Sequence, residues 1–375
     1  MATFFHQLIK EVMQLKMSLL IDSGEFWKAL KKDIDSSQKY IYILTLSFEG
    51  DSVGKMLSDQ LITSKAVDIR ILIDQYTRYI LSDHFLYAPE NLFDSKLRLE
   101  AKETKRMISH LNQVGIKAKF TNPVGFFFLR FPARNHKKML LIDDAVAYIG
   151  GINFSEHNFD WHDMMLRIED EKVTQFLKED FITTWNGKNL NTIRSFPNIT
   201  FYVFDGCTNE DNHKPVFALI EKAEKSIFVE SPYLSFPFYE RLREARQKGV
   251  AVTLITPEKN NRKNLQHYSL WEARRSSFNL HLYRERMTHL KAMLIDDRIL
   301  IMGSSNFDYL SYCCQQEIMA VVTDREIISE FKERVIIRDL KNSIPFDGEI
   351  TMVKEHIRYF ILRSLGKISV TLCRI

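Results

Sequence analysis

Two stretches of the sequence carry the same reactive side chains at the same spacing. Each has a histidine, a lysine two positions later, an aspartate five positions after the lysine, and an asparagine that follows a glycine-containing turn. The separation between the histidine and the asparagine is also the same in both copies. The first copy is His136, Lys138, Asp143 and Asn153, and the second is His289, Lys291, Asp296 and Asn306.

These residue types suit chemistry at a phosphate group. A histidine acts as a nucleophile or as a general acid near neutral pH. A lysine two residues further along an extended strand points to the same side as the histidine, and the asparagine adds an amide donor. One copy makes half a site, and two copies together place two imidazoles among donors that suit phosphoryl oxygens. The pattern therefore predicts phosphodiester chemistry that needs no metal ion and no other cofactor.

The elements that must position these residues follow the same order twice. Hydrophobic periodicity predicts helices over 25–37, 53–64, 101–113, 215–225, 238–247 and 265–276, and strands over 40–46, 69–74, 116–120, 226–230, 250–255 and 280–283. Short strands over 139–142 and 145–149 follow the first histidine and lysine. The alternation of strands and helices predicts an α/β fold of mixed, mostly parallel sheets with helices on their faces.

The repeated order indicates a duplication into two similar halves. We expect a first domain over 1–195 with the first motif, a second over 196–349 with the second motif, and a basic amphipathic tail over 350–375. Equivalent loops of the two halves would then meet at one interface, which is where we expect the active site.

At these residues the sequence resembles the phospholipase D superfamily, whose hallmark is a paired HxKx4D(x6)GSxN motif. The resemblance covers about residues 17–335 and implies two phospholipase D-like α/β/α domains. Within the superfamily the sequence looks most like the bacterial cardiolipin synthase branch. The residues that support this branch are Asn135-His136-Lys137-Lys138, Gly150-Gly151-Ile152-Asn153 in place of Gly-Ser-x-Asn, Trp161-His162-Asp163, Leu166-Arg167-Ile168-Glu169, Glu230-Ser231-Pro232-Tyr233, Asn306-Phe307-Asp308 and Glu317.

The resemblance implies unequal roles for the two histidines, which the residues alone leave interchangeable. His136 would attack the phosphorus and carry a covalent phosphohistidine. His289 would protonate the leaving alcohol and then deprotonate the acceptor. Asp163 and Glu317 match the carboxylates of the family that orient the imidazoles, each serving the histidine of the opposite half.

The resemblance also implies roles for the other residues of the motif. Lys138, Lys291, Asn153 and Asn306 would hold the phosphate oxygens. The motif aspartates, Asp143 and Asp296, would be mainly structural. His162 lies at no metal-ligand spacing, and we interpret it as an ordinary polar residue.

Composition limits the choice of partner. The chain has 375 residues, 45% of them hydrophobic and 27% charged, so it can bury a full core. Its formal net charge of +4 favours an anionic partner, either phospholipid or nucleic acid. The basic residues are scattered rather than arranged in a groove with stacking aromatics, which makes nucleic acid the less favoured partner. Four cysteines, Cys207, Cys313, Cys314 and Cys373, form no CxxC pair and indicate a reducing compartment.

Two further stretches bear on the membrane. The stretch over 125–134 contains four phenylalanines and two arginines just before His136, and it is either a loop that enters a bilayer or a core-filling strand. The tail over 351–375 is basic and apolar, and it either lies on an anionic membrane or docks on the second domain. Residues 1–20 carry too many charges for a signal peptide or a membrane span. We therefore expect a cytoplasmic protein associated peripherally with the inner face of the cell membrane.

The function that the resemblance implies is transfer of a phosphatidyl group, through a phosphohistidine, to the hydroxyl of a second phospholipid. Two alternatives remain at this point. A hydrolytic phospholipase D or a nuclease of the same superfamily would use the same two half-sites with different surroundings. A catalytically silent membrane-binding module would not need the full set of histidines, lysines, asparagines and acidic partners.

Overall fold

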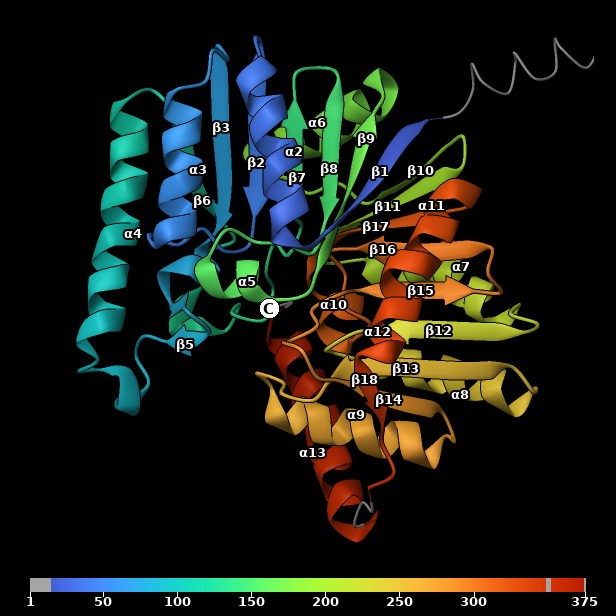
Figure 1. Cartoon of the computed structure of the whole chain (residues 1–375). Coiled ribbons are helices and arrows are strands. Elements are labelled where there is room, and N and C mark those ends of the chain that lie inside the picture. The colour runs from blue at the N-terminus through green and yellow to red at the C-terminus, as the bar shows by residue number, and fades with distance from the viewer. Residues whose placement is uncertain (1–14, 349–351, 374–375) are drawn as a thin grey trace, which may run out of the picture.

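Two sheets of matching strand order form the centre of the molecule in a computed structural model that describes residues 15–348 and 352–373 (Figure 1). The first sheet has the order β1 (Lys16–Ile21), β9 (Met164–Glu169), β8 (Val146–Gly150), β7 (Met139–Ile142), β2 (Tyr40–Thr45), β3 (Asp68–Asp74) and β6 (Lys117–Thr121). The second has the order β10 (Thr192–Phe196), β11 (Ile199–Asp205), β17 (Gln316–Val322), β16 (Ile299–Gly303), β15 (Ala292–Ile295), β12 (Ser226–Glu230), β13 (Ala251–Pro257), β14 (Asn279–Tyr283) and β18 (Ser343–Pro345).

The two sheets are copies of one plan. The order from β1 to β6 in the first sheet repeats from β11 to β14 in the second, where β10 and β18 add one strand at each edge. In both sheets the strand that follows the motif histidine and lysine pairs with the strand before the turn to the motif asparagine, as β7 with β8 and β15 with β16. The repeat that the sequence predicted is therefore present in the topology.

The sheets are mixed, but the expectation of mostly parallel pairing was wrong. Parallel pairs join β2 to β3 and β3 to β6 in the first sheet, and β12 to β13 and β13 to β14 in the second, while the remaining pairs are antiparallel. The reason is that each parallel pair joins two strands of one sheet that a long helix connects. Tight turns then join the motif strands into hairpins, and a hairpin pairs its strands antiparallel.

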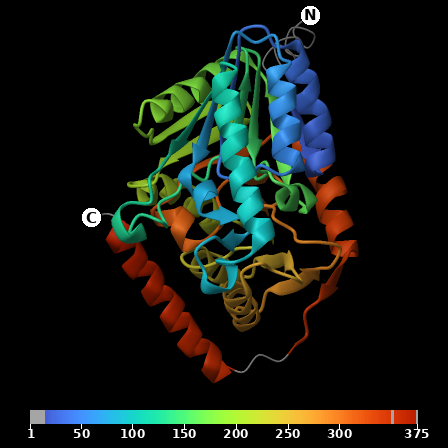
Figure 2. The same cartoon turned by 90° about the vertical axis from the view of Figure 1, so that its left-hand side faces the viewer.

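Helices cover the outer faces of both sheets. The first sheet packs against α2 (Asp22–Ser36), α3 (Ser52–Ile62) and α4 (Ser95–Gln113), which lie over it in the view of Figure 2. The second packs against α7 (Asn209–Glu221), α8 (Phe238–Gln247) and α9 (Lys263–Arg275). A shared core of both halves includes α6 (Glu171–Trp185) and α11 (Arg325–Phe331). This shared core fixes how the two half-sites meet.

Aspartate caps set the starts of several helices. Asp94 accepts hydrogen bonds from the backbone N–H groups of Lys96 and Leu97, so α4 begins at Ser95 rather than near residue 101 as the periodicity predicted. Asp51, Asp170 and Asp324 cap α3, α6 and α11 in the same way. At its other end α4 stops before Gly115, whose φ of 94° belongs to the left-handed region that glycine adopts freely.

Short elements complete the chain. They are η1 (Gln75–Arg78), β4 (Ile80–Leu81), β5 (His84–Phe85), η2 (Pro89–Asn91), η3 (Phe126–Phe128), α5 (Glu156–Asp160), α10 (Tyr309–Cys313), η4 (Lys332–Ile337) and α12 (Arg338–Lys341). The C-terminal helix α13 (Met352–Cys373) docks on the second half through Tyr359, Leu362 and Val370. Among the described residues, no helix combines the length and the apolar character needed to cross a bilayer. Residues 1–14, where the sequence predicted no signal peptide, lie outside the described part.

Candidate active site

His136 meets the carboxylate of Glu317 from the other half of the chain. The two residues are held together by backbone pairing, since the N–H of His136 donates to the carbonyl of Gln316 at 2.8 Å and the N–H of Gln316 donates to that of Arg134 at 2.9 Å. Nδ1 of His136 lies 2.9 Å from Oε1 of Glu317 and 3.0 Å from the carbonyl oxygen of Ser304. Because both partners only accept, Nδ1 carries the hydrogen and Nε2 keeps its lone pair for a substrate.

The carboxylate of Glu317 is buried and well supplied with donors. Besides His136, it accepts hydrogen bonds from Oγ of Ser311 at 2.8 Å and from Oγ of Ser304 at 2.5 Å. Burial by itself would raise the pKa of Glu317, but His136, Lys138 and Ser304 together hold that pKa below its usual value. Glu317 is therefore an anion that favours positive charge on the His136 imidazole.

His289 meets Asp163 in the same way, with the halves exchanged. The N–H of His162 donates to the carbonyl of Met287 at 2.9 Å, and the N–H of His289 donates to that of His162 at 2.7 Å. Nδ1 of His289 lies 2.7 Å from Oδ2 of Asp163, and the backbone N–H of Met164 donates to the other carboxylate oxygen at 2.8 Å. The site thus contains two imidazole–carboxylate pairs, each built from both halves.

A lysine distinguishes the second pair from the first. Nζ of Lys291 lies 2.9 Å from Nδ1 of His289 and 3.9 Å from Oδ2 of Asp163. An ammonium group only donates and a carboxylate only accepts, so Nδ1 cannot bond to both. Asp163 is the nearer of the two, so Nδ1 of His289 carries a hydrogen and donates it to Asp163. Lys291 instead donates to the carbonyl oxygen of His289.

Both imidazoles are buried, and burial lowers their pKa. For His136 the loss of hydration lowers the pKa, and Glu317 opposes that shift. For His289, burial followed by the nearby Lys291 lowers the pKa to about 3. Both rings are therefore neutral in the empty site near pH 7. The negative charge of a bound phosphodiester would favour protonation of either ring.

The lysines of the motif lie behind the histidines. Nζ of Lys138 donates to the carbonyl oxygen of His136 at 2.7 Å, and Lys291 makes the equivalent bond to His289. Burial lowers the pKa of Lys138 to about 7 and that of Lys291 to about 8. Burial therefore disfavours the charged form of each lysine, and a bound phosphate anion would favour it.

The asparagines of the motif line the cavity between the halves together with the histidines. The amide nitrogen of Asn153 donates to Oδ1 of Asn158 at 3.1 Å. Oδ1 of Asn306 is buried and has no hydrogen-bond partner among the described residues. The structure therefore brings His136, His289, Asn153 and Asn306 to one cavity wall.

The motif aspartates lie elsewhere. The carboxylate of Asp143 accepts from the backbone N–H groups of residues 38–40, just before β2, at 2.8 to 3.1 Å. The carboxylate of Asp296 accepts from the N–H groups of residues 224–226, just before β12, at 2.7 to 3.0 Å. Each aspartate thus joins a motif hairpin to the start of the neighbouring strand, β2 or β12, and does not line the cavity.

The cavity has a volume of about 710 Å³, within the usual range for ligand sites. Aromatic rings surround its catalytic wall, with Trp161 at 4.7 Å and Tyr233 at 5.9 Å from the His289 ring, centre to centre. Apolar groups from Phe131, Phe236 and Leu362 also line the cavity. The lining therefore offers both polar groups for a phosphate and apolar groups for hydrocarbon.

The interpretation of His162 as an ordinary polar residue was wrong. Its ring is fully buried between the halves, with Nδ1 2.6 Å from Oδ1 of Asp22 and Nε2 2.9 Å from Oδ2 of Asp339. Burial opposes its charge, but these two carboxylates raise the pKa of His162 to about 10. The charged ring therefore joins Asp22 of the first half to Asp339 of the second, directly beside Asp163 in the chain. The partners lie 140 and 177 residues away in sequence, so no local pattern could reveal them.

One cluster near this ring has the residue types of a metal site. Ligand atoms of His162, Glu230 and Asp339 lie within 4.8 Å of one another. Both ring nitrogens of His162 already face carboxylates, and a charged imidazole has no lone pair to give. The cluster therefore fits an ion pair between the halves better than a metal ion.

The fold and the paired half-sites define the class. The sequence matches the family described as "Cardiolipin synthase, PLD-like domain" over residues 30–185 and 216–336, and the chain belongs to this family. Among curated relatives, it is 25% identical to cardiolipin synthase 1 of Staphylococcus epidermidis over 85% of this chain and 66% of that protein. It is 22% identical to the major cardiolipin synthase of Bacillus subtilis over 86% of this chain and 69% of that one.

A solved structure shares the fold. The crystal structure of phosphatidylserine synthase from Haemophilus influenzae matches with a TM-score of 0.67 over 96% of this chain and 95% of that chain, at 14% identity. The likeness at this identity concerns the fold alone. The chain spans about two thirds of the length of the curated relatives.

Proposed function

We propose that the protein is a phosphatidyltransferase of the cardiolipin synthase type. The observation that carries this proposal is the crossed pairing of His136 with Glu317 and of His289 with Asp163 around one cavity. Two imidazoles, each oriented by a carboxylate, supply a nucleophile and an acid–base group for displacement at phosphorus. Membership of the family and the names of the relatives support phospholipids as the substrates.

In the first half-reaction, Nε2 of His136 attacks the phosphorus of phosphatidylglycerol. The nitrogen–phosphorus bond forms while the bond to the glycerol oxygen breaks. His289, protonated beside the bound anion, gives its Nε2 proton to that oxygen, and glycerol leaves. The phosphatidyl group then remains on His136, whose Nδ1–H still faces Glu317.

In the second half-reaction, the hydroxyl of a second phosphatidylglycerol attacks the same phosphorus. Nε2 of His289 takes the hydroxyl proton as the nitrogen–phosphorus bond breaks. The net change converts two molecules of phosphatidylglycerol into one cardiolipin and one glycerol. Both histidines return to their starting state, so no metal ion or cofactor is consumed.

The surroundings of the two imidazoles favour His136 as the nucleophile. Phosphorylation at Nε2 leaves positive charge on the ring, and the Nδ1–H of His136 faces two acceptors, Glu317 and the Ser304 carbonyl. His289 has a cation, Lys291, beside its ring, which makes a proton on that ring easier to lose. His136 is thus suited to carry the adduct and His289 to release a proton.

Lys138, Lys291, Asn153 and Asn306 would stabilise the phosphate oxygens. The two lysines supply positive charge from behind the imidazoles, and the asparagines lie on the cavity wall. Positive charge close to those oxygens favours a transition state in which negative charge grows on them.

Transfer and hydrolysis differ only in the acceptor. Water would give phosphatidic acid from the same intermediate. The apolar lining at Phe131 and Phe236 favours a lipid hydroxyl over water as the acceptor.

The test is a product analysis. The purified full chain incubated with phosphatidylglycerol should release cardiolipin and glycerol in equal amounts, measured by mass spectrometry. The His136→Ala variant should release neither, and a chelator should leave the wild-type rate unchanged. Phosphatidic acid as the sole lipid product, or a strict requirement for a metal ion, would contradict the proposal.

The proposed substrates imply a location. We place the protein peripherally on the inner face of the cell membrane, with anionic phospholipid as its substrate and the bilayer as its partner. The net charge of +4 is compatible with an anionic surface. Fractionation of cells should recover the chain with membranes and release part of it at high salt.

A further inference from the structure

The stretch over 125–131, here called the phenylalanine turn, holds two aromatic rings in solvent. The side chains of Phe126 and Phe127 are 78% and 80% exposed. Phe127 and Phe128 have φ angles of 48° and 60°, in the left-handed region that bulky residues rarely adopt. The ring of Phe128 packs against Tyr79 at 5.0 Å and so anchors the turn. The core-filling alternative for this stretch is therefore wrong, since its foremost rings point outward.

Helix α13 is apolar on two opposite faces. Its inner face packs on the second half, and the nearest atom to a Cβ built on Gly366 is a ring carbon of Tyr309, at 3.1 Å. Its outer stripe, which follows helical spacing, consists of Ile357, Phe360, Ile361, Leu365 and Ile368, all exposed. Phe360 is 71% exposed. The docking alternative for the tail therefore accounts for only one of the two faces.

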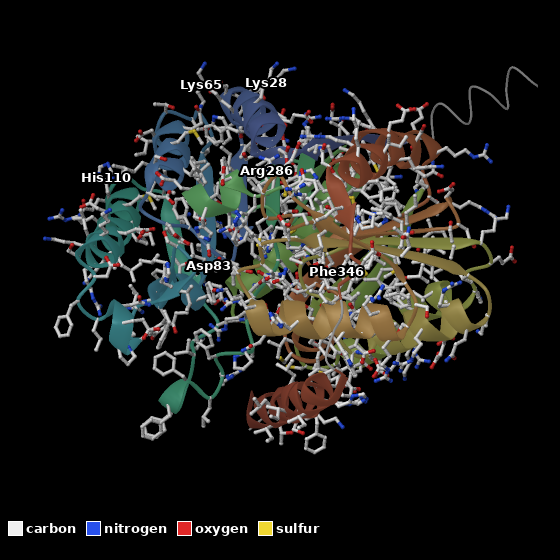
Figure 3. The ribbon with its side chains drawn as sticks, turned by 60° about the horizontal axis from the view of Figure 1, so that its bottom comes forward. Lys28, Lys65, Asp83, His110, Arg286 and Phe346 are labelled. Atoms are coloured by element: carbon white, nitrogen blue, oxygen red, sulfur yellow. The ribbon has the colours of Figure 1, made fainter. Side chains whose placement is uncertain are left out.

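Both surfaces adjoin the cavity that contains the catalytic histidines. Phe131 and Pro132, at the end of the phenylalanine turn, line the cavity from the first half. Leu362, Leu365 and Gly366 of α13 line it from the second. Figure 2 shows the C-terminal part of α13 close to the phenylalanine turn, and Figure 3 shows both projecting from the same side of the molecule. The cavity thus opens between two exposed apolar rims.

Basic side chains accompany these rims. Arg130 in the turn and Lys367 on α13 are exposed, and the exposed Arg262 and Lys263 line the cavity on the second half. Exposed apolar rings flanked by cations suit the interface of an anionic bilayer, where rings enter the hydrocarbon boundary and cations remain among the head groups. A protein partner would not require the rims to adjoin the cavity that contains the histidines.

We propose that the phenylalanine turn and the outer stripe of α13 form one docking surface for an anionic lipid bilayer. In this position the cavity opens directly to the membrane, and a phospholipid enters between the two rims without leaving the hydrocarbon. The choice of lipid as occupant rests on the proposed function, but binding to the membrane requires no turnover.

The experiment is flotation of the full chain with vesicles of phosphatidylcholine, with and without phosphatidylglycerol. The wild type should float with the anionic vesicles. Phe126→Ser/Phe127→Ser and Phe360→Ser/Ile361→Ser should each lower the partition coefficient by about tenfold or more, since each removes two side chains from the bilayer boundary. None of the four residues lines the cavity. Both variants should therefore keep wild-type turnover on phosphatidylglycerol dispersed in detergent micelles.

The matched control removes two exposed apolar side chains elsewhere. Val67 is near Lys65, which Figure 3 shows on the opposite side of the molecule, and Ile337 precedes α12. Val67→Ser/Ile337→Ser should float like the wild type. Equal loss in the control and in the docking variants would overturn the proposal, because it would show that no particular surface binds.

The remaining outcomes separate this proposal from the proposed function. Docking variants that bind vesicles like the wild type while cardiolipin forms in micelles would overturn the docking surface alone. Vesicle binding that depends on the two rims, with no phospholipid product, would support the surface and contradict the function. A wild type that ignores vesicles but forms dimers that the same variants dissolve, seen by sedimentation, would show a protein interface and overturn the proposal.

Discussion

The two half-sites share one backbone frame but differ in what surrounds each imidazole. At His136 the carboxylate is Glu317, which also accepts from Ser304 and Ser311. At His289 the carboxylate is the shorter Asp163, with Lys291 close to the ring. The duplicated fold therefore makes the two half-sites similar, and the neighbours of each imidazole make them differ. In the proposed mechanism, residues that do not line the cavity make one imidazole a nucleophile and the other an acid.

The largest expected effect is a difference between the two histidine variants that depends on the leaving group of the substrate. His136→Ala should abolish turnover on every substrate, because no adduct can form. His289→Ala should slow release of an alkoxide by about 10²–10⁴-fold but should release a p-nitrophenolate, which needs no proton, at close to the wild-type rate. The measurement is single-turnover kinetics on the two kinds of phosphodiester. If both variants lose the same activity on both substrates, the two histidines do not have different roles.

A second prediction concerns the turn residue next to each carboxylate. Gly151 and Ser304 are equivalent, yet a Cβ on Gly151 would lie 2.3 Å from both carboxylate oxygens of Asp163. Gly151→Ala should therefore displace Asp163 and lower kcat by about 10²-fold or more, whereas Ser304→Ala removes one of several donors to Glu317 and should cost about tenfold.

A matched substitution controls for effects on the fold. A Cβ on Gly24 would meet nothing within 4 Å, so Gly24→Ala should leave kcat unchanged. A Gly151→Ala enzyme of wild-type activity would show that Asp163 has room to move and does not orient His289.

Replacing either buried lysine of the motif should raise the stability of the fold and lower the activity. The pKa of Lys138 is about 7 and that of Lys291 about 8, against 10.5 for an ordinary lysine. Between pH 7 and 10.5 the unfolded chain therefore binds more protons, and the free energy of unfolding should rise with pH in this window. Lys138→Met and Lys291→Met should each raise the free energy of unfolding at pH 7 by about 1–3 kcal/mol and lower activity by about 10²-fold or more.

Lys137 is the matched control, measured with the others by urea denaturation. It is also buried, but its Nζ lies 2.7 and 2.8 Å from the carboxylate oxygens of Asp180. Lys137→Met leaves that carboxylate without its partner and should destabilise the fold by about 3–5 kcal/mol. If Lys138→Met and Lys291→Met destabilise as much, the lysines are paired in the empty site and are not held ready for a phosphate.

The sequence predicted much of the frame for a physical reason. Hydrophobic periodicity located the helices and strands that precede each motif, and the repeated spacing predicted two equivalent half-sites. The contacts of Asp163 with His289 and of Glu317 with His136 are present in the structure, while the catalytic roles of these residues stay predictions. Mostly parallel pairing was wrong, because the hairpin turns after each lysine reverse the strand direction.

Several features that the sequence did not predict depend on contacts that form only in the folded chain. The charge on His162 comes from Asp22 and Asp339, which only the packed halves bring to its ring. The hydroxyl of Ser311 reaches Glu317 across the short connection between α10 and β17. Phe126 and Phe127 are exposed in a turn whose backbone angles at Phe127 and Phe128 are left-handed, which a run of phenylalanines does not indicate.

The smallest expected effect concerns the motif aspartates. Asp143 and Asp296 each bind backbone N–H groups at the start of a strand and do not line the cavity. Asp143→Asn and Asp296→Asn should each lower the free energy of unfolding by about 1–3 kcal/mol and leave kcat within about twofold of the wild type. Thermal unfolding and steady-state rates at a temperature well below the transition check this. A large loss of kcat in a folded variant would give these aspartates a part in catalysis.

The two half-sites have unequal surroundings, and we propose that His136 carries the phosphatidyl group. The most direct measurement is acid-free quenching of the enzyme during turnover of labelled phosphatidylglycerol, followed by peptide mapping of the acid-labile adduct. We predict label on the peptide that contains His136, none on the peptide that contains His289, and accumulation of label in His289→Ala with an activated substrate. Label on His289, or turnover without any adduct, would contradict the account.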